Sequence, residues 1–306
     1  MRLSGTAGRR LKGACAEERN TVFMEVIVAG TAGFCFGVKR AVEQVYKQLE
    51  SGKAPICTYG PIIHNEEVVR ELGERGVKVL ESEEELKALK EGVVIIRSHG
   101  VPERILELIN DNVEIVDATC PFVKKIHNIV NAESSEGKKI IIVGNEGHPE
   151  VEGIKGWVRN GDVIVVGSIE DAEKMPQEDN ASTCVVAQTT FNYNKFQDIV
   201  EIISKKGYNI HVVNTICNAT QERQTEAEQI ARQVDAMIVI GGRNSSNTQK
   251  LFEICKKECK NTYYIQTLVD LDFKESGFIR SVGITAGAST PNNIIEEVRT
   301  NVRIKL

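Results

Sequence analysis

Three features that are absent from this chain of 306 residues narrow its function. The formal net charge is −5 and no basic stripe runs through the sequence, which argues against a nucleic-acid binder. No apolar run approaches the roughly 20 residues that are needed to cross a bilayer, so we expect no membrane partner. The Gly-x-Gly-x-x-Gly and Gly-Lys-Ser/Thr fingerprints of nucleotide sites are also missing.

Cysteine, in contrast, is well represented. Eight cysteines in a chain of this kind indicate a reducing compartment and metal chemistry more than a disulfide scaffold, and we expect a cytoplasmic protein. Residues 1–23 join no periodic pattern and precede a second methionine, Met24. We interpret them as an extension from an upstream start, because Glu17 and Glu18 do not fit a transit peptide.

Three of the cysteines stand at equivalent places in a repeat. Cys35, Cys120 and Cys217 are separated by 85 and 97 residues, and each lies where a strand-like run gives way to a helical pattern. In each unit a polar residue ends the next strand. These residues are His64, His148 and Ser245, which follow the cysteine of their unit by 29, 28 and 28 residues. Agreement at so long a period is a repeat signal.

The repeat predicts an α/β fold of three related domains with pseudo-threefold symmetry. Each unit alternates apolar strands, bounded by glycine, with helical patterns of about ten residues, which is typical of parallel α/β layers. The expected domains are 36–120, 121–216 and 217–306. The third unit lacks the last strand of the other two, and the N-terminal segment 24–35 supplies it.

Residues that carry chemistry follow the strands of this fold. Ligands collect beyond the carboxyl ends of strands in open α/β sheets, so we expect one central cleft. The residues at these ends are Cys35, Cys120, Cys217, His64, His99, His148, Thr189, Ser245 and Ser289.

The repeated cysteines are candidate metal ligands. Thiolates bind soft metals and iron–sulfur clusters. A cubane cluster on three thiolates leaves one iron without a protein ligand, and an open metal position is what catalytic sites keep. Three buried structural cysteines are the alternative, since free cysteine is commonly buried, but the repeat favours ligation.

The remaining cysteines and histidines are expected to be structural or irrelevant to the site. A metal pair is possible at Cys255 and Cys259, which share one face of a helix, but no other ligand joins them. The others lie in apolar strands, in a helix or in the extension; they are Cys15, Cys57, Cys184, His127 and His211.

Glu150 is the candidate proton donor. It follows His148 and Pro149, and the proline fixes the turn that aims both side chains from one loop. A carboxylic acid donates a proton only if its pKa is raised, which an anionic ligand in the same cleft would do. A solvated glutamate is the alternative. Thr189 could relay the proton or orient a bound hydroxyl group.

Five motifs resemble the 4-hydroxy-3-methylbut-2-enyl diphosphate reductase (LytB/IspH) family. They read GFCFGVKRA (33–41), DATCP (117–121), GHPEVEG (147–153), NSSNT (244–248) and TAGAS (285–289), within a similarity that covers about residues 24–303. The resemblance implies a trefoil of three α/β domains around one [4Fe–4S] cluster per chain, held by the three cysteines. It implies an oxidoreductase that removes the substrate hydroxyl reductively to give isopentenyl and dimethylallyl diphosphates, the last step of the non-mevalonate isoprenoid pathway.

The implied diphosphate needs many hydrogen-bond donors. Helices expected to start near Glu66, Pro102, Thr248 and Pro291 can direct backbone N–H groups at it. The side chains expected to bind the substrate are His64, His99, His148, Thr189, Ser245, Ser246, Asn247 and Ser289, with Ser98 and Thr190 as weaker candidates. Because the chain has no nucleotide or flavin motif, electrons are expected from a ferredoxin or flavodoxin. We expect a monomer or a weak dimer.

Two other classes of protein remain open. An enzyme similar to quinolinate synthase, a condensing dehydratase with a three-cysteine cluster, would need carboxylate-binding residues and no external electrons. A non-enzymatic iron–sulfur sensor would have no use for Glu150 or for residues 245–247, and a structural zinc protein is a weaker form of this alternative.

Overall fold

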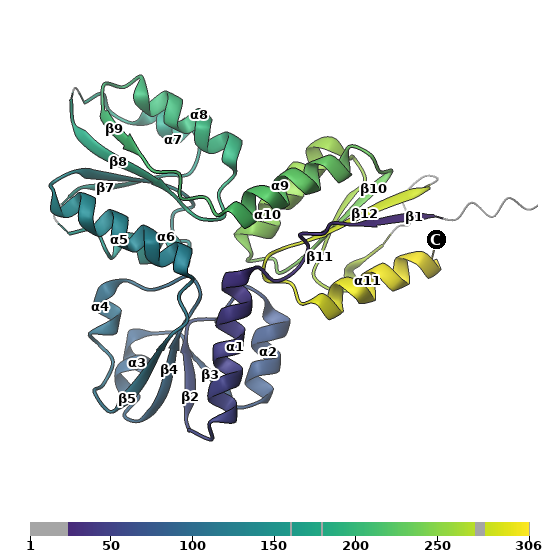
Figure 1. Ribbon diagram of the computed structural model, residues 1–306, viewed down its shortest axis with the longest axis horizontal. Coiled ribbons are helices and arrows are strands. Elements are labelled where there is room, and N and C mark those ends of the chain that lie inside the picture. The colour runs from purple at the N-terminus through teal and green to yellow at the C-terminus, as the bar shows by residue number, and fades with distance from the viewer. Residues whose placement is uncertain (1–23, 160, 179, 273–278, 306) are drawn as a thin grey trace, which may run out of the picture.

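Three lobes meet at the centre of the molecule, and each contains one four-stranded parallel sheet (Figure 1). The computed structural model describes residues 24–305 apart from 160, 179 and 273–278, so the N-terminal extension with Cys15 lies outside the described residues. The predicted fold class, three α/β units with parallel sheets, is confirmed.

The first lobe has the strand order β3-β2-β4-β5. Its elements are α1 (Phe36–Glu50), β2 (Ile56–Tyr59), α2 (Glu66–Glu74), β3 (Val77–Leu80), α3 (Glu83–Ala88), β4 (Gly92–Ile96), α4 (Glu103–Leu106) and β5 (Val113–Asp117).

The second lobe repeats this order as β7-β6-β8-β9. Its elements are α5 (Pro121–Ser135), β6 (Lys139–Val143), α6 (Pro149–Lys155), β7 (Val163–Val166), α7 (Ile169–Lys174), β8 (Ser182–Ala187), α8 (Tyr193–Ser204) and β9 (Asn209–Val212).

The third lobe joins the two ends of the described chain in the order β1-β12-β10-β11. β1 lies parallel to β12, with Glu25 opposite Ser281 and Val28 opposite Ile284. Its elements are β1 (Glu25–Val28), α9 (Asn218–Ala231), β10 (Ala236–Ile240), α10 (Ser246–Glu258), β11 (Thr262–Ile265), a 3₁₀ turn (Leu268–Asp270), β12 (Ser281–Ala286) and α11 (Asn292–Lys305).

Each sheet is buried on both faces. In β6, Ile140, Ile141, Ile142 and Val143 are fully buried, and alternate residues pack into two different apolar clusters. The other two sheets likewise separate two clusters each. Continuous apolar runs are what a parallel strand needs when helices cover both faces of its sheet.

The three long helices α1, α5 and α9 begin near the centre, where the lobes meet (Figure 1). The residue that caps the N-terminus of each helix is Cys35, Cys120 or Cys217, and none of these cysteines forms a side-chain capping bond. The first N–H groups of a helix have no partner within the helix. The fold therefore places each thiol beside the positive end of a helix.

Two predicted helices differ from the structure. The helix expected to start near Pro102 begins at Glu103 but ends at Leu106, because the Leu108 N–H and the Ile109 N–H bond three residues back, to Ile105 and Leu106, as in 3₁₀ turns. A helix of four residues has a small dipole, so its expected contribution to binding an anion is small. α10 begins at Ser246, two residues before the expected Thr248.

No helix in the described part of the chain is long and apolar enough to span a membrane.

Candidate functional site

A cavity lies where the three lobes meet. All the residues that the sequence places in the site line this cavity, as do the weaker candidates Ser98 and Thr190. The lining residues from the prediction are Cys35, Cys120, Cys217, His64, His99, His148, Glu150, Thr189, Ser245, Ser246, Asn247 and Ser289. Residues up to 254 positions apart in the chain thus line the same cavity.

The three thiols interact electrostatically with one another. Burial is the main cause that raises the pKa of Cys120 to about 11; the N–H groups of Phe122 and Val123 oppose the rise, and the thiols of Cys35 and Cys217 add to it. A Cβ atom on Gly37 would lie 2.5 Å from the Cys120 sulfur, so only glycine lets the first turn of α1 approach that thiol. Three partly exposed thiols therefore face one cavity.

The spacing of the thiols indicates what they could hold. Among the described residues, the group of three metal-ligand atoms that lie within 4.8 Å of one another is that of Glu133, Cys184 and His211, and the three central cysteines do not qualify. Sulfur atoms on a single zinc, each at about 2.3 Å from the metal, would be closer together than this. The central donor set is all sulfur, and at least two of its sulfur atoms are more than 4.8 Å apart, which fits a multi-iron cluster better than one ion.

Three histidine rings form a second wall of the cavity. The ring centroid of His64 lies 4.3 Å from that of His99 and 5.4 Å from that of His148, and the last two are 5.7 Å apart. Burial is the main cause that lowers the pKa of all three, for His148 to about 4; the neighbouring rings contribute for His99 and His148, and the Arg97 guanidinium contributes for each. The rings are therefore neutral at pH 7.

The histidine nitrogens are available to a ligand. Nε2 of His64 and Nδ1 of His99 are buried without a hydrogen-bond partner. Nδ1 of His148 accepts the backbone N–H of Glu150 at 3.1 Å, so a neutral His148 carries its proton on Nε2. Orphaned buried polar atoms are rare in folded proteins and indicate a missing partner.

Glu150 is buried and lies on a helix, which the sequence did not predict. It is 2% exposed, and it is the second residue of α6, which begins at Pro149 and is capped by His148. Its Oε1 accepts the Thr189 N–H at 2.6 Å and its Oε2 accepts the Thr189 hydroxyl at 2.8 Å. The alternative of a solvated glutamate is excluded.

Burial raises the pKa of Glu150 to about 7, although both bonds from Thr189 lower it. The expected raised pKa therefore has a different main cause from the one predicted, since no anionic ligand is needed for it. A carboxyl group with this pKa is protonated in about half of the molecules at pH 7, which suits a general acid.

The residues of the third lobe have unequal environments. Ser245 caps α10, where its Oγ accepts from the N–H and hydroxyl of Thr248, so its own proton is free for a ligand. Both amide atoms of Asn247 are buried without a partner. Ser289 donates to the His64 carbonyl oxygen at 2.9 Å and thus supports a neighbouring ligand residue.

Ser246 connects two lobes. Its hydroxyl lies 3.2 Å from the Thr190 hydroxyl, 3.3 Å from Gln188 Nε2 and 3.5 Å from Asn145 Nδ2, all in the second lobe. Gln188 is fully buried and was not among the predicted residues. These contacts fix how the second and third lobes meet beside Glu150.

The sequence prediction also missed two arginines near the site, of which Arg97 is partly exposed and Arg223 is buried. Arg97 follows β4 and influences all three histidines. Arg223 lies in α9, is 3% exposed and donates to backbone carbonyls. A signal was present in each case: Arg97 stands at a strand end beside Ser98 and His99, and Arg223 is six residues after Cys217.

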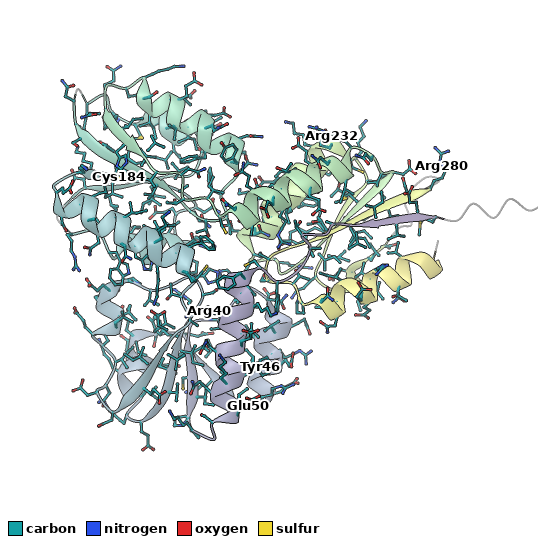
Figure 2. All side chains as sticks on the ribbon, in the orientation of Figure 1. Arg40, Tyr46, Glu50, Cys184, Arg232 and Arg280 are labelled. Atoms are coloured by element: carbon teal, nitrogen blue, oxygen red, sulfur yellow. The ribbon has the colours of Figure 1, made fainter. Side chains whose placement is uncertain are left out.

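The group formed by Glu133, Cys184 and His211 differs from the central site. Figure 2 shows Cys184 in the second lobe, away from the centre of the molecule, whereas Arg40 lies close to that centre. Oε2 of Glu133 binds Lys138 Nζ at 2.7 Å and its Oε1 contacts His211 Nδ1 at 3.1 Å. Burial raises the pKa of Cys184 to about 12. The acid is already paired and the thiol is protonated, so these residues are structural.

The other residues that were expected to be structural are buried. His127 stacks on Trp157, with ring centroids 5.1 Å apart. Cys255 and Cys259 pack in an apolar cluster, and their sulfurs face the carbonyl oxygens of Ala227 and Val234 at 3.9 and 3.7 Å. Cys57 is buried in β2.

Known proteins resemble the chain over almost its whole length. The family model described as LytB protein matches residues 26–303. A protein named 4-hydroxy-3-methylbut-2-enyl diphosphate reductase from Caldanaerobacter subterraneus subsp. tengcongensis is 47% identical over 282 residues, which cover 92% of this chain and 97% of that protein. A protein of the same name from Clostridioides difficile (strain 630) is 44% identical over 278 residues, with 90% and 98% covered.

Two solved structures share the fold. One is (E)-4-hydroxy-3-methyl-but-2-enyl diphosphate reductase, described as the terminal enzyme of the non-mevalonate pathway; it is 42% identical with a TM-score of 0.66, and the match covers 92% of this chain and 99% of that one. The other is the E-1-hydroxy-2-methyl-but-2-enyl-4-diphosphate reductase from Plasmodium falciparum, 29% identical with a TM-score of 0.84, covering 91% and 87%.

Proposed function

Since the chain belongs to the LytB family, we propose for it the activity for which its relatives are named. It is a 4-hydroxy-3-methylbut-2-enyl diphosphate reductase, an oxidoreductase that removes the hydroxyl group of this allylic diphosphate to give isopentenyl and dimethylallyl diphosphates. The reaction is the last step of the non-mevalonate isoprenoid pathway. The family resemblance inferred from the sequence motifs is confirmed.

One observation carries the chemistry: a single cavity joins three thiols, three neutral histidines and a buried acid. Reductive dehydroxylation needs a source of electrons, donors for a diphosphate and a proton for the leaving hydroxyl group. The three sets of residues correspond to these three needs.

Cys35, Cys120 and Cys217 would hold a [4Fe–4S] cluster, with one iron lacking a protein ligand. The all-sulfur donor set and its wide spacing support this assignment over a single zinc ion. When bound, the cluster supplies the electrons and a Lewis-acidic iron with an open position.

The histidine wall and the third lobe would bind the diphosphate. Neutral imidazoles donate through N–H, the partnerless amide of Asn247 can donate through Nδ2, and Arg97 contributes positive charge nearby. The full proposed set is that of the sequence prediction: His64, His99, His148, Thr189, Ser245, Ser246, Asn247 and Ser289.

Glu150 and Thr189 would deliver the proton. When Oε2 of Glu150 is protonated, it donates to the Thr189 hydroxyl, whose own proton is then free to point at the substrate. The hydroxyl group takes this proton and leaves as water when the C–O bond breaks. Two electrons enter, and a second proton adds to one of two carbons of the allyl fragment, which accounts for two products.

The remaining sequence predictions stay part of the proposal. They are a ferredoxin or flavodoxin as electron donor, a cytoplasmic location, a monomer or weak dimer, and domains at 36–120, 121–216 and 217–306 with 24–35 completing the third. The absence of nucleotide fingerprints from the sequence supports an external electron donor.

An anaerobic assay with reduced viologen and the allylic diphosphate tests the function. We expect viologen oxidation that depends on the substrate, with both diphosphate products formed. A quinolinate synthase-like enzyme would need no external electrons, and an iron–sulfur sensor would bind iron without turnover. Either result would contradict the proposed function.

A further inference from the structure

Arg223 is a buried cation at the junction of three segments. It lies in α9, which begins at Cys217, and it is 3% exposed. Its Nη1 donates to the Ala286 carbonyl at 2.8 Å and its Nη2 to the Gly33 carbonyl at 3.0 Å. Ala286 ends β12, and Gly33 precedes Cys35 by two residues. The guanidinium thus links the segments that carry two of the three central thiols.

The charge of Arg223 has no hydrogen-bonded acid among the described residues. Its Nε is buried without a partner. Glu226 is the nearest acid in electrostatic terms, but its carboxylate accepts from the N–H groups of Gly30 and Thr31 and from the Thr31 hydroxyl, at 2.8, 2.9 and 2.5 Å. A buried charge without a partner is costly, so an anion is expected beside Arg223.

The thiols are the groups that can supply this anion. Burial lowers the pKa of Arg223, while Cys35, Glu226 and Cys217 raise it, Cys35 most strongly. Cys120 is not among these groups. The bond to the Gly33 carbonyl and the place of Arg223 in α9 put the positive charge beside the segments that carry Cys35 and Cys217.

We propose that Arg223 is a positioning residue whose fixed positive charge is the counterion of the iron–sulfur site and favours its reduced state. The inference rests on the proposed function, since it presumes a cluster on Cys35, Cys120 and Cys217. An added electron makes such a site more negative, and a nearby cation stabilises the more negative state more strongly. Charge and hydrogen bonds around a cluster are known means by which a protein sets its potential.

Arginine suits this role better than other residues. Its guanidinium stays charged when it is buried, and its planar fork can hold two carbonyl groups at once. A neutral residue of similar length would keep one carbonyl bond and lose the charge. A lysine would keep the charge and lose the fork. Comparing the two replacements therefore separates the effect of the charge from that of the paired carbonyl bonds.

Redox titration of the loaded protein, followed by EPR, tests the proposal on Arg223→Gln and Arg223→Lys. For Arg223→Gln we expect the reduction equilibrium to shift at least tenfold toward the oxidised state, which is about 59 mV for one electron. Arg223→Lys is expected to stay within about threefold of the unaltered protein, or about 28 mV. The matched control is Arg232→Gln at the C-terminal cap of the same helix, since Arg232 is exposed and pairs with Glu228 and Glu258.

A normal potential in Arg223→Gln would overturn the proposal, because it would leave Arg223 as a structural link only. A tenfold shift in Arg223→Lys would overturn it as well. If Arg223→Gln does not hold iron, the potential of Arg223→Lys alone tests the proposal, by the limits given above. Thermal unfolding gives a second readout: loading should raise Tm more in the unaltered protein than in Arg223→Gln, and equal increments would contradict a counterion role. An unaltered protein without iron and sulfide would instead refute the proposed function, before any titration.

Discussion

Two regions of the described chain are rich in metal-ligand residues, and they differ in how their charges are compensated. In the second lobe, Glu133 already binds Lys138 and contacts His211, and Cys184 is buried and protonated. At the centre, imidazole and amide atoms are buried without partners, and Arg223 has no acid bonded to it. Ligand atoms that lie close together do not by themselves make a site. Unmatched groups that gather around one cavity identify where a ligand belongs.

The largest difference between the regions is expected for loss of a thiol. Cys120→Ser should lower iron and labile sulfide close to zero and reduce turnover to background, because a ligand of the proposed cluster is removed. Cys184→Ser changes a buried core thiol and should keep the iron content of the unaltered protein. Iron and sulfide analysis after anaerobic purification measures both. Loss of iron in Cys184→Ser with retention in Cys120→Ser would reverse the comparison.

The two glutamates should also differ strongly. Glu150→Gln removes the proposed proton donor, and we expect turnover to fall by about 10²–10⁴-fold while iron stays bound. Glu133→Gln should leave turnover unchanged, since its carboxylate binds Lys138 outside the cavity. Steady-state rates with reduced viologen provide the measurement. Near-normal turnover in Glu150→Gln would refute the proton role.

Asn247→Ala tests the unpaired polar atoms of the central cavity. If the amide bonds the diphosphate, its loss should lower kcat/KM by about 5- to 150-fold, or about 1–3 kcal/mol. The effect should appear mainly as a higher KM for the substrate. His211→Ala, in the outer region, is the control and should not change KM. An unaltered KM in Asn247→Ala would remove this residue from the proposed binding set.

Acidity provides a further contrast between the two glutamates. Burial raises the pKa of Glu150 to about 7, whereas the hydrogen bond from Lys138 lowers that of Glu133. Turnover that depends on protonated Glu150 should fall about tenfold per pH unit above pH 7. A profile that stays flat from pH 7 to 9 would contradict this.

The same pKa shift makes a prediction for stability in the unloaded protein. The raised pKa of Glu150 stabilises the fold below pH 4.5, and this contribution of about 3 kcal/mol is lost as pH rises through about 7. The lowered pKa of Glu133 acts in the opposite sense, since its contribution is present above pH 4.5 and is lost as pH falls. When stability is measured by denaturant unfolding, the Glu150→Gln variant should not show this loss of stability between pH 4.5 and 7.

The smallest effect is expected for the exposed part of the outer region. His211 has 58% of its side chain exposed, so its contact with Glu133 is screened by water. His211→Ala should change the free energy of unfolding by less than about 1 kcal/mol at pH 7. A larger loss, measured by urea unfolding, would mean that the outer residues act as a cooperative unit.

The sequence predicted the fold because its repeat is periodic in both cysteines and strands. The placement of Cys35, Cys120 and Cys217 before helices and the apolar run of β6 are local signals, and the structure shows both. The confirmed fold class and family follow from them. The short α4 was missed, because 3₁₀ turns and an α-helix have similar apolar patterns.

Environment was harder to predict than location. The sequence placed Glu150 near the cleft, but its burial and its two bonds to Thr189 depend on how α6 packs against the end of β8. Arg97 and Arg223 were missed since a single arginine in a sequence does not reveal what surrounds its side chain. The roles of all site residues stay predictions until they are measured.

Iron and acid-labile sulfide analysis of the unaltered protein, purified without oxygen, tests the central claim most directly. The proposed cluster predicts about four iron and four sulfide per chain, together with an EPR signal on reduction that changes when the allylic diphosphate is added. Stoichiometric zinc, or a single iron without sulfide, would contradict the assignment of the three cysteines to one cluster.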